Sequence, residues 1–421
     1  MEWLRKGLAV RKAEASTDRG AGFGALAANL KSACTIPDLL FFIPFGIWLL
    51  AKLVQRSSFS AFVDDATLFS NTMVLCMVVL AVREVVFGKH DRDALLWCVV
   101  VAVFAELAFH AHYQELCDTA LIVFFARDIG FKRLVVLWFA IMVPFLAVTF
   151  ASVAIGVLPD IVYEDEGWRG ARHCLGFAHP NGGGAYTLMA ALAWAAIRNR
   201  DYGLADGVVT LAVTLGVYYF TSCRSMLVGV VILLVLQVVR VALPGRVTSW
   251  KSVRYTAVSF TAVVIAVTLA LCFAYDPESG WMAFLDHLTS GRLRLAHENI
   301  VAYGITPWGQ EMPYGATSGY SVTTGEWVQR NASTLVDCAY ARMLLHCGLA
   351  CLLAYVALCT AAAKCCLDQG EWVYLAILAV VALYGVMEGA VLSAVYCPFV
   401  FLLALPMAHA LQGPSQEPVS P

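Results

Sequence analysis

A polar segment at residues 169–184 separates two long apolar runs of this chain. It reads RGARHCLGFAHPNGGG and brings Arg172, His179 and Asn181 together with a proline and three consecutive glycines. The unpaired N–H groups at a helix start, next to arginine and asparagine, can bind an anion. The same residues would also suit a tight loop that asparagine and proline cap, with glycines for close helix packing. The segment alone leaves both interpretations open.

Arginine also occurs in two later polar elements. Arg224 lies in TSCRS at residues 221–225, a turn so short that its side chain must lie close to hydrocarbon. An unpaired arginine costs roughly 2.5–3.5 kcal/mol at mid-bilayer and less near its edge. Arg292 and Arg294 lie in SGRLR at residues 290–294. These side chains could bind phosphate or carboxylate in a two-point manner, whereas Arg224 could also simply contact lipid headgroups.

Possible proton acceptors follow the same arginines. At helical spacing, Arg294, His297 and Glu298 share one face, and histidine or carboxylate can accept a proton from a sugar hydroxyl. An amphipathic helix on the membrane surface would show the same pattern. Asp337, in VDCAY, could act as a base or pair with an arginine, and Glu388 is another acid, for which buried ion pairing is the alternative. No CxxC metal spacing occurs in the chain.

The composition identifies the solvent that must surround these residues. Of 421 residues, 60% are hydrophobic and 14% are charged, whereas a soluble protein carries roughly 25% charged residues. The apolar residues are spread along nearly the whole chain. The net charge of −2 does not indicate a partner. We therefore predict an all-α, polytopic integral membrane protein.

The apolar runs predict about twelve spans, since one span needs about 20 residues. A cytoplasmic tail at residues 1–33 precedes the membrane domain at 34–411, and a disordered tail follows at 412–421. The predicted spans are 36–54, 67–87, 94–110, 116–126, 134–157, 179–197, 204–221, 225–243, 254–274, 335–360, 371–386 and 391–411.

The basic residues predict the orientation of these spans. Lysine and arginine of the alternate connections, such as Lys132 and Lys251, lie inside if both termini are cytoplasmic. Beyond Lys52 and Arg56 at the end of the first span, the outer side carries arginine alone. A large outer loop at 275–334 is rich in tryptophan and tyrosine, whose faces suit sugar rings. The outer basic residues are Arg169, Arg172, Arg224, Arg292, Arg294, Arg330 and Arg342.

The order of these motifs resembles the O-antigen polymerase/ligase superfamily. The matching elements are Arg172 with GFAHPN at 176–181, TSCRS at 221–225, SGR at 290–292 and VDCAY at 336–340. An inner segment, FARDIGFKR at 125–133, and the acidic element Tyr384…Glu388 are similar to capsular repeat-unit polymerases. The resemblance covers most of the chain from about residue 30 onward.

The resemblance implies a GT-C-like membrane glycosyltransferase that acts on undecaprenyl-pyrophosphate-linked glycans at the outer face of the cytoplasmic membrane. It would polymerise repeat units, without a metal, beside a flippase and a chain-length regulator. The sister activity, ligase transfer of a finished glycan to another acceptor, shares these motifs. The implied pyrophosphate ligands are Arg172, Arg224 and Arg292 with Arg294, the implied orienting residues are His179 and Asn181, and the candidate catalytic residues are Asp337, His297 and His179.

A secondary transporter is the alternative from another class, because glycine-interrupted helices also mark transporter sites. Transporters place such helices in paired halves. Here the polar elements gather on one predicted side, and the large outer loop has no counterpart in the other half. These features favour the glycosyltransferase.

Overall fold

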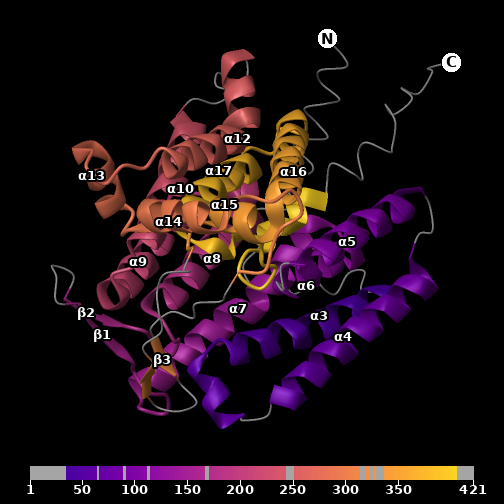
Figure 1. Ribbon diagram of the computed structural model, residues 1–421. Coiled ribbons are helices and arrows are strands. Elements are labelled where there is room, and N and C mark those ends of the chain that lie inside the picture. Colours follow the sequence, from indigo (N-terminus) through magenta and orange to yellow (C-terminus); the bar gives the residue numbers. More distant parts are fainter. Residues whose placement is uncertain are drawn as a thin grey trace.

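The computed structural model describes residues 35–63, 66–88, 92–110, 114–165, 170–242, 251–312, 319–321, 326–328 and 336–404. Within these ranges the chain is mostly α-helix (Figure 1). Among the residues in these ranges, seven helices are long and apolar enough to cross a membrane. The prediction of an all-α membrane protein is confirmed at this level. The predicted tails at 1–33 and 412–421 lie outside the described residues.

The α-helices follow the apolar runs, and short 3-10 or π turns join several of them. They are α3 (Ile36–Gln55), α4 (Ala66–Phe87), α5 (Arg92–His110), α6 (Gln114–Phe125), α7 (Phe131–Ala154), α8 (Pro180–Arg198), α9 (Leu204–Thr221), α10 (Arg224–Ala242), α12 (Lys251–Phe273), α13 (Gly280–Leu288), α14 (Arg292–Tyr303), α15 (Ala339–Arg342), α16 (Gly348–Asp368) and α17 (Trp372–Met387). The short turns are η1 (Ser58–Phe62), η2 (Asn199–Asp201), η4 (Met343–Cys347), η5 (Gly389–Leu392) and η6 (Pro398–Ala404).

The number of candidate spans is smaller than the twelve predicted. Helices α5 and α8 coincide with predicted spans but are not among the seven. Helix α8 begins with PNGGG, which lowers its hydropathy. Helices α6 and α17 have only 12 and 16 residues. Between 389 and 404, where a span at 391–411 was predicted, the chain forms the turns η5 and η6 instead of an α-helix.

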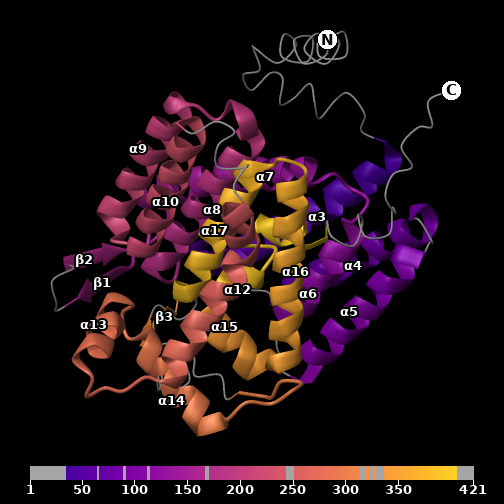
Figure 2. The same cartoon turned by 90° about the horizontal axis from the view of Figure 1, so that it is seen from above.

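Helix α8 occupies the centre of the bundle. It packs against α7 on one side and against α9 and α10 on others, and α10 in turn contacts α17. Figures 1 and 2 show α8 enclosed by these helices, with the α3–α4 pair and the α12–α16 pair farther out. The side chains of Tyr186 and Leu188 on α8 are fully buried. Helix α8 is therefore packed on several sides by its neighbours.

Two small sheets lie outside the helices. The hairpin β1 (Val162–Asp165) and β2 (Gly170–His173) is antiparallel and pairs Tyr163 with Arg172. Strands β3 (Gly319–Ser321) and β4 (Glu326–Val328) form a second hairpin. In Figure 2 the β1–β2 hairpin, α13 and α14 lie toward the same lower left part of the molecule, which we call the loop end.

The segment after α14 is fixed to the bundle by a close backbone contact. Gly309 and Gly348 both have positive φ, +88° and +83°, and a Cβ on Gly309 would lie 2.3 Å from the His346 carbonyl oxygen. The Gln310 N–H donates to that same oxygen at 3.1 Å. Only glycine permits this approach. The contact anchors part of the predicted outer loop to the start of α16.

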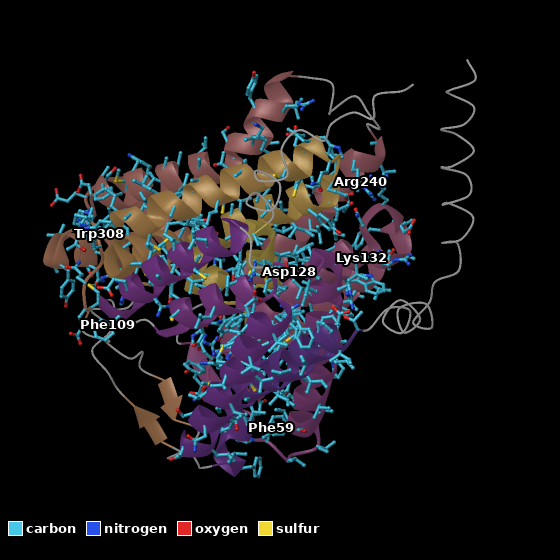
Figure 3. All side chains as sticks on the ribbon, turned by 90° about the vertical axis from the view of Figure 1, so that its right-hand side faces the viewer. Phe59, Phe109, Asp128, Lys132, Arg240 and Trp308 are labelled. Atoms are coloured by element: carbon cyan, nitrogen blue, oxygen red, sulfur yellow. The ribbon has the colours of Figure 1, made fainter. Side chains whose placement is uncertain are left out.

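The two ends of the bundle differ in residue type. Figure 3 shows Lys132 and Arg240 near one side and Trp308 with Phe109 on the opposite side. Trp308 is 62% exposed. These two basic residues therefore lie opposite these two aromatic residues, and the predicted orientation in the membrane stays a prediction.

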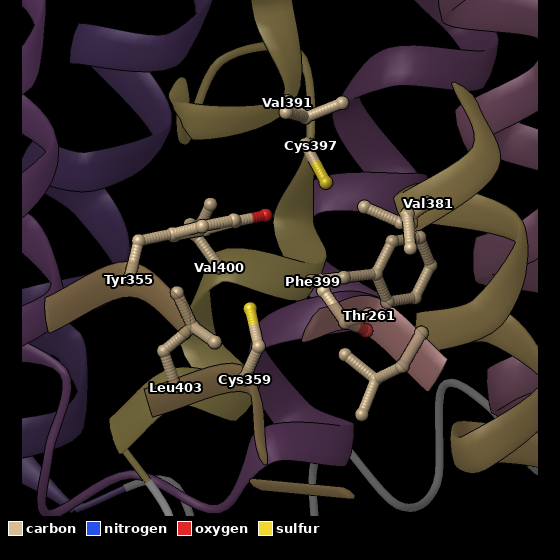
Figure 4. Close-up of a pocket in the computed structure, with 11 residues that line it drawn as sticks. Thr261, Tyr355, Cys359, Val381, Val391, Cys397, Phe399, Val400 and Leu403 are labelled. Carbon is tan, nitrogen blue, oxygen red and sulfur yellow. The ribbon is translucent and has the colours of Figure 1, made fainter. Parts of the chain in front are cut away.

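A small cavity lies in the core between α12, α16, α17 and η6. Figure 4 shows that Tyr355, Cys359, Cys397 and Phe399 line it. Its volume is about 10 Å³, which is no more than about one water molecule needs. This cavity is therefore too small to hold a substrate.

Candidate functional site

Five polar side chains from separate elements meet at one place. Arg172 of β2 donates to Asn181 Oδ1 at 2.8 Å, and Asn181 Nδ2 donates to Glu388 Oε1 at 2.9 Å. Arg292 Nη2 lies 3.2 Å from that same Glu388 oxygen and 3.4 Å from Asp337 Oδ2. We call these five residues the arginine–carboxylate cluster. The fold thus brings together four of the residues that the sequence predicted, and adds Glu388.

Arg172 is held by a strand and a helix end. Its Nε donates to the carbonyl oxygen of Thr221 at 3.1 Å, at the end of α9. The last carbonyls of a helix have no intrahelical partner and carry partial negative charge, so a cation there is favourable. The side chain of Arg172 therefore bridges the end of α9 and the start of α8.

The HPN turn begins α8. His179 is the N-cap residue, with an extended backbone, and its Nδ1 accepts from the Asn181 N–H at 3.1 Å. Pro180 follows at the first helical position, where its missing N–H is not needed. Tyr163 contacts the His179 ring edge-on, and its hydroxyl donates to the Ala178 carbonyl at 2.9 Å. These contacts direct Asn181 toward the cluster.

His179 is neutral at physiological pH. Surrounding protein atoms and the positive charges of Arg172 and Arg292 lower its pKa to about 4. The neutral ring accepts a hydrogen bond at Nδ1, as capping requires. The structure thus gives His179 a role in positioning the helix start, and its predicted catalytic role stays a prediction.

Glu388 is the central acceptor of the cluster. It follows α17 in an extended conformation, and only 16% of its side-chain surface is exposed. Burial and the charge of Asp337 raise its pKa, while Arg292, Asn181 and Arg172 lower it; burial dominates, and the pKa is about 7. A carboxylate with this pKa can exchange a proton near neutral pH.

Arg292 is fixed by four acceptors. Besides the two carboxylates, its Nε donates to the Met387 carbonyl at 2.5 Å and its Nη1 to the Thr289 carbonyl at 3.0 Å. Only 9% of the surface of Arg292 is exposed. A left-handed turn at Ser290 and Gly291, with φ of +59° and +81°, precedes α14 and aims the side chain at the end of α17. The Ser290 and Gly291 turn of the SGR element therefore directs the Arg292 side chain toward Glu388.

Arg224 lies at the edge of the site. It is the first residue of α10, after Ser222 in the left-handed conformation, and its Nη2 donates to Ser290 Oγ at 3.2 Å. This bond joins the TSCRS turn to the SGR turn. A Cβ on Gly184 of α8 would lie 2.5 Å from Cys223 Sγ, so the glycine allows the turn to approach α8.

His297 and Arg294 lie on other contacts of α14. His297 Nδ1 is 2.9 Å from the Cys272 carbonyl oxygen, at the end of α12. Arg294 is half exposed and pairs with Glu298 at 3.2 Å, as the spacing predicted, and with Asp286 at 4.0 Å. Neither contact joins the arginine–carboxylate cluster. Their predicted roles in catalysis and substrate binding stay predictions.

Sequence reasoning noted Glu388 but gave it no role. The available signal was one acidic residue between two strongly apolar segments, where an ionisable side chain needs a partner. The partners, Asn181 and Arg292, lie 207 and 96 residues away in the chain, so periodicity could not reveal them.

The arginine–carboxylate cluster combines two arginines with two carboxylates, those of Glu388 and Asp337. Within the described ranges, no group of three or more His, Cys, Asp or Glu side chains could hold a metal ion. Two arginines and an asparagine amide can bind an anion, while Glu388 can accept a proton beside them. This arrangement suits a reaction in which an anionic group departs and a hydroxyl loses its proton.

Comparison of the chain with models of protein families, with curated proteins and with solved structures finds no match in any of the three.

Proposed function

We propose that this protein is a membrane glycosyltransferase that polymerises undecaprenyl-pyrophosphate-linked repeat units into a surface polysaccharide. The single observation that carries the proposal is the meeting of Arg172, Arg292 and Glu388 in one buried cluster at the loop end. The motif resemblance supplies the substrate class. The proposal includes a GT-C-like arrangement, an extracytoplasmic site, cytoplasmic termini, and a flippase and chain-length regulator as partners.

The reaction joins the anomeric carbon of a donor glycan to a hydroxyl oxygen of an acceptor glycan. The bond between that carbon and the pyrophosphate oxygen breaks, and its electron pair leaves with the pyrophosphate. The hydroxyl proton goes to a protein base. Because negative charge collects on the leaving group, fixed arginine donors should supply most of the transition-state stabilisation.

Arg172 and Arg292 suit the leaving group, and Arg224 stands beside them. Arg172 and Arg292 are held by backbone carbonyls at 2.5–3.1 Å, so their guanidinium planes are oriented before substrate arrives. Preorganised donors need little rearrangement during the reaction. Asn181 holds Arg172 against the start of α8 and orients the donor.

Glu388 suits the role of the base. Its pKa of about 7 leaves a useful fraction ionised at neutral pH while keeping it basic enough to take a proton. Asp337 is more exposed, at 36% of its side chain, and pairs with the same Nη2 of Arg292 as Glu388 does. In this scheme Asp337 keeps Arg292 in place while Glu388 accepts the proton.

The test is a single-protein assay with lipid-linked oligosaccharides extracted from a host strain that lacks this gene. The purified wild type should yield a ladder of lipid-linked products, whereas Arg172→Ala and Arg292→Ala should yield none. Arg254→Ala is the matched control, because Arg254 pairs with Asp368 at 3.3 Å and both are half exposed. A single transfer to a different acceptor would support a ligase instead. Normal ladders from both cluster variants would refute the proposal.

A further inference from the structure

A second polar group lies beside the arginine–carboxylate cluster and has no part in the scheme above. Arg56 follows α3 directly, and its Nη2 pairs with Glu115 Oε1 of α6 at 2.6 Å. Its guanidinium carbon lies 4.5 Å from the centre of the Tyr396 ring. About a quarter of the surface of each charged side chain is exposed, 22% and 24%. The pair is therefore within reach of a ligand.

Two donors of this group lack well-oriented acceptors. Tyr186 is fully buried on α8 and stacks on Tyr396 with ring centres 4.6 Å apart and an angle of 7°. Among the described residues, neither its hydroxyl nor Arg56 Nη1 makes a hydrogen bond of ordinary geometry, although the hydroxyl lies close enough to Arg56 and Tyr396 to interact with both. A buried polar group without a partner is unfavourable, most of all a charged one. A ligand oxygen placed between them would satisfy both.

The group adjoins the proposed catalytic site through two connections. The Ser58 N–H donates to the Gly176 carbonyl at 2.8 Å, so Arg56 is tied to the segment that begins α8. A Cβ on Gly389, the residue after Glu388, would lie 3.0 Å from Arg342 Nη1, and the charge of Arg342 also acts on Glu115. Arg342 thus lies between Glu388 and the Arg56–Glu115 pair.

The charges and shapes of this group define its ligand. Arg56 and Arg342 are two cationic side chains that both act on Glu115, and arginine side chains at such a place can bind an anion. Tyr396 is partly exposed and is supported from below by the buried Tyr186 ring, and a partly exposed aromatic side chain suits a sugar ring. A group with both properties is a sugar that carries an anionic substituent.

We propose that Arg56, Arg342, Tyr186 and Tyr396 form a subsite for an acidic sugar of the acceptor glycan. The inference rests on the proposed function. There the donor pyrophosphate takes Arg172 and Arg292, and the attacking hydroxyl lies at Glu388. The acceptor sugar extends beyond Glu388, toward Arg342 and Arg56. The structure assigns the specificity for a negatively charged repeat unit to this subsite.

The experiment measures saccharide binding to the purified full-length protein by saturation-transfer NMR. The probes are a disaccharide that ends in glucuronic acid, the same disaccharide that ends in glucose, and one that ends in glucose 6-phosphate. Wild type should bind both acidic probes and bind the neutral one at least about tenfold more weakly, as the loss of a charged hydrogen bond implies. Equal binding of acidic and neutral probes would overturn the proposal.

The variants separate this subsite from the catalytic cluster. Arg56→Gln should lose about tenfold in acidic-probe affinity, Arg56→Lys less, and Tyr186→Phe should weaken binding without lowering the melting temperature, because its hydroxyl makes no hydrogen bond of ordinary geometry among the described residues. Arg133→Gln is the matched control, since Arg133 pairs with Asp38 at 3.0 Å and lies over Phe42 at the other end of α3.

Different results would refute the acidic-sugar subsite and the catalytic scheme. Arg172→Ala should bind the acidic probe normally while making no polymer. Unchanged acidic-probe binding in Arg56→Gln, or in Tyr186→Phe if Arg56→Gln does not fold, would overturn the acidic-sugar subsite whatever the polymerase assay gives. Normal polymer from Arg172→Ala would instead refute the catalytic scheme.

Discussion

Replacement of Glu388 by glutamine should strongly lower the polymerisation rate and stabilise the protein at alkaline pH. Glutamine keeps the shape of the side chain and an oxygen that can accept from Asn181 and Arg292. It removes the charge and the ability to take a proton. Because a positioned base contributes about 10²–10⁴ to a rate, polymerisation by Glu388→Gln should fall by that factor.

The stability effect follows from the pKa. Burial raises the pKa of Glu388 from 4.5 to about 7 in the folded protein. Between these values the folded state holds a proton that the unfolded state has released, so the free energy of unfolding falls as pH rises. The difference corresponds to roughly 3 kcal/mol once the pH exceeds about 7. Glutamine has no such loss, and Asp337 still balances Arg292.

Thermal unfolding in detergent between pH 5 and pH 8 tests this reasoning. The melting temperature of Glu388→Gln should exceed that of wild type at pH 8, and the difference should shrink steadily toward pH 5. The wild-type polymerisation rate should fall about tenfold per pH unit below pH 7, because the base must be ionised. A Glu388→Gln protein that is less stable than wild type at pH 8 would refute the burial argument. A wild-type rate in that variant would refute the role of Glu388 as base.

Three further predictions concern the surroundings of Glu388. Arg172→Lys should lower the polymerisation rate more than Arg224→Lys does, because Arg172 uses two edges of its fork on Thr221 and Asn181; equal rates in the two variants would contradict this. Gly385→Ala should lower the melting temperature, since its Cβ would lie 2.7 Å from the Tyr340 hydroxyl; an unchanged melting curve would show that Tyr340 can move. His179→Ala should lower the free energy of unfolding by about 1 kcal/mol through the lost helix cap, and His179→Asn should lower it less. Denaturant or thermal unfolding would measure both changes. Because the pKa of His179 is about 4, neither variant should change the pH–rate profile between pH 6 and pH 8.

The helices were predictable because their apolar runs are long. The predicted span 36–54 corresponds to Ile36–Gln55, and 204–221 coincides with Leu204–Thr221. The last predicted span was wrong as an α-helix in its described part. There Gly389 and Pro398 interrupt an apolar sequence, and the chain turns sharply twice. Hydropathy measures how apolar a segment is, but not whether its backbone continues as one helix.

The members of the site were only partly predictable. Arg172, Asn181 and Arg292 stood out because polar residues are costly near a membrane, and the structure places all three in one cluster. Their mutual contacts depend on segments far apart in the chain. His297 and Arg294 share the helix of Arg292, but α14 packs against α12 so that His297 meets the Cys272 carbonyl. Helical spacing alone could not decide which face of α14 meets α17.

The link between Asn181 and Glu388 also bears on when the protein can become active. The two residues are 207 positions apart, and synthesis at about 5–20 residues per second takes roughly 10–40 s to cover that distance. Through this interval the nascent chain already contains Arg172 and the start of α8, but not the carboxylate that completes their contacts. The site is therefore assembled among the last steps of biogenesis. A chain that stops before α17 ends would insert most of its helices and yet hold no proton acceptor at position 388.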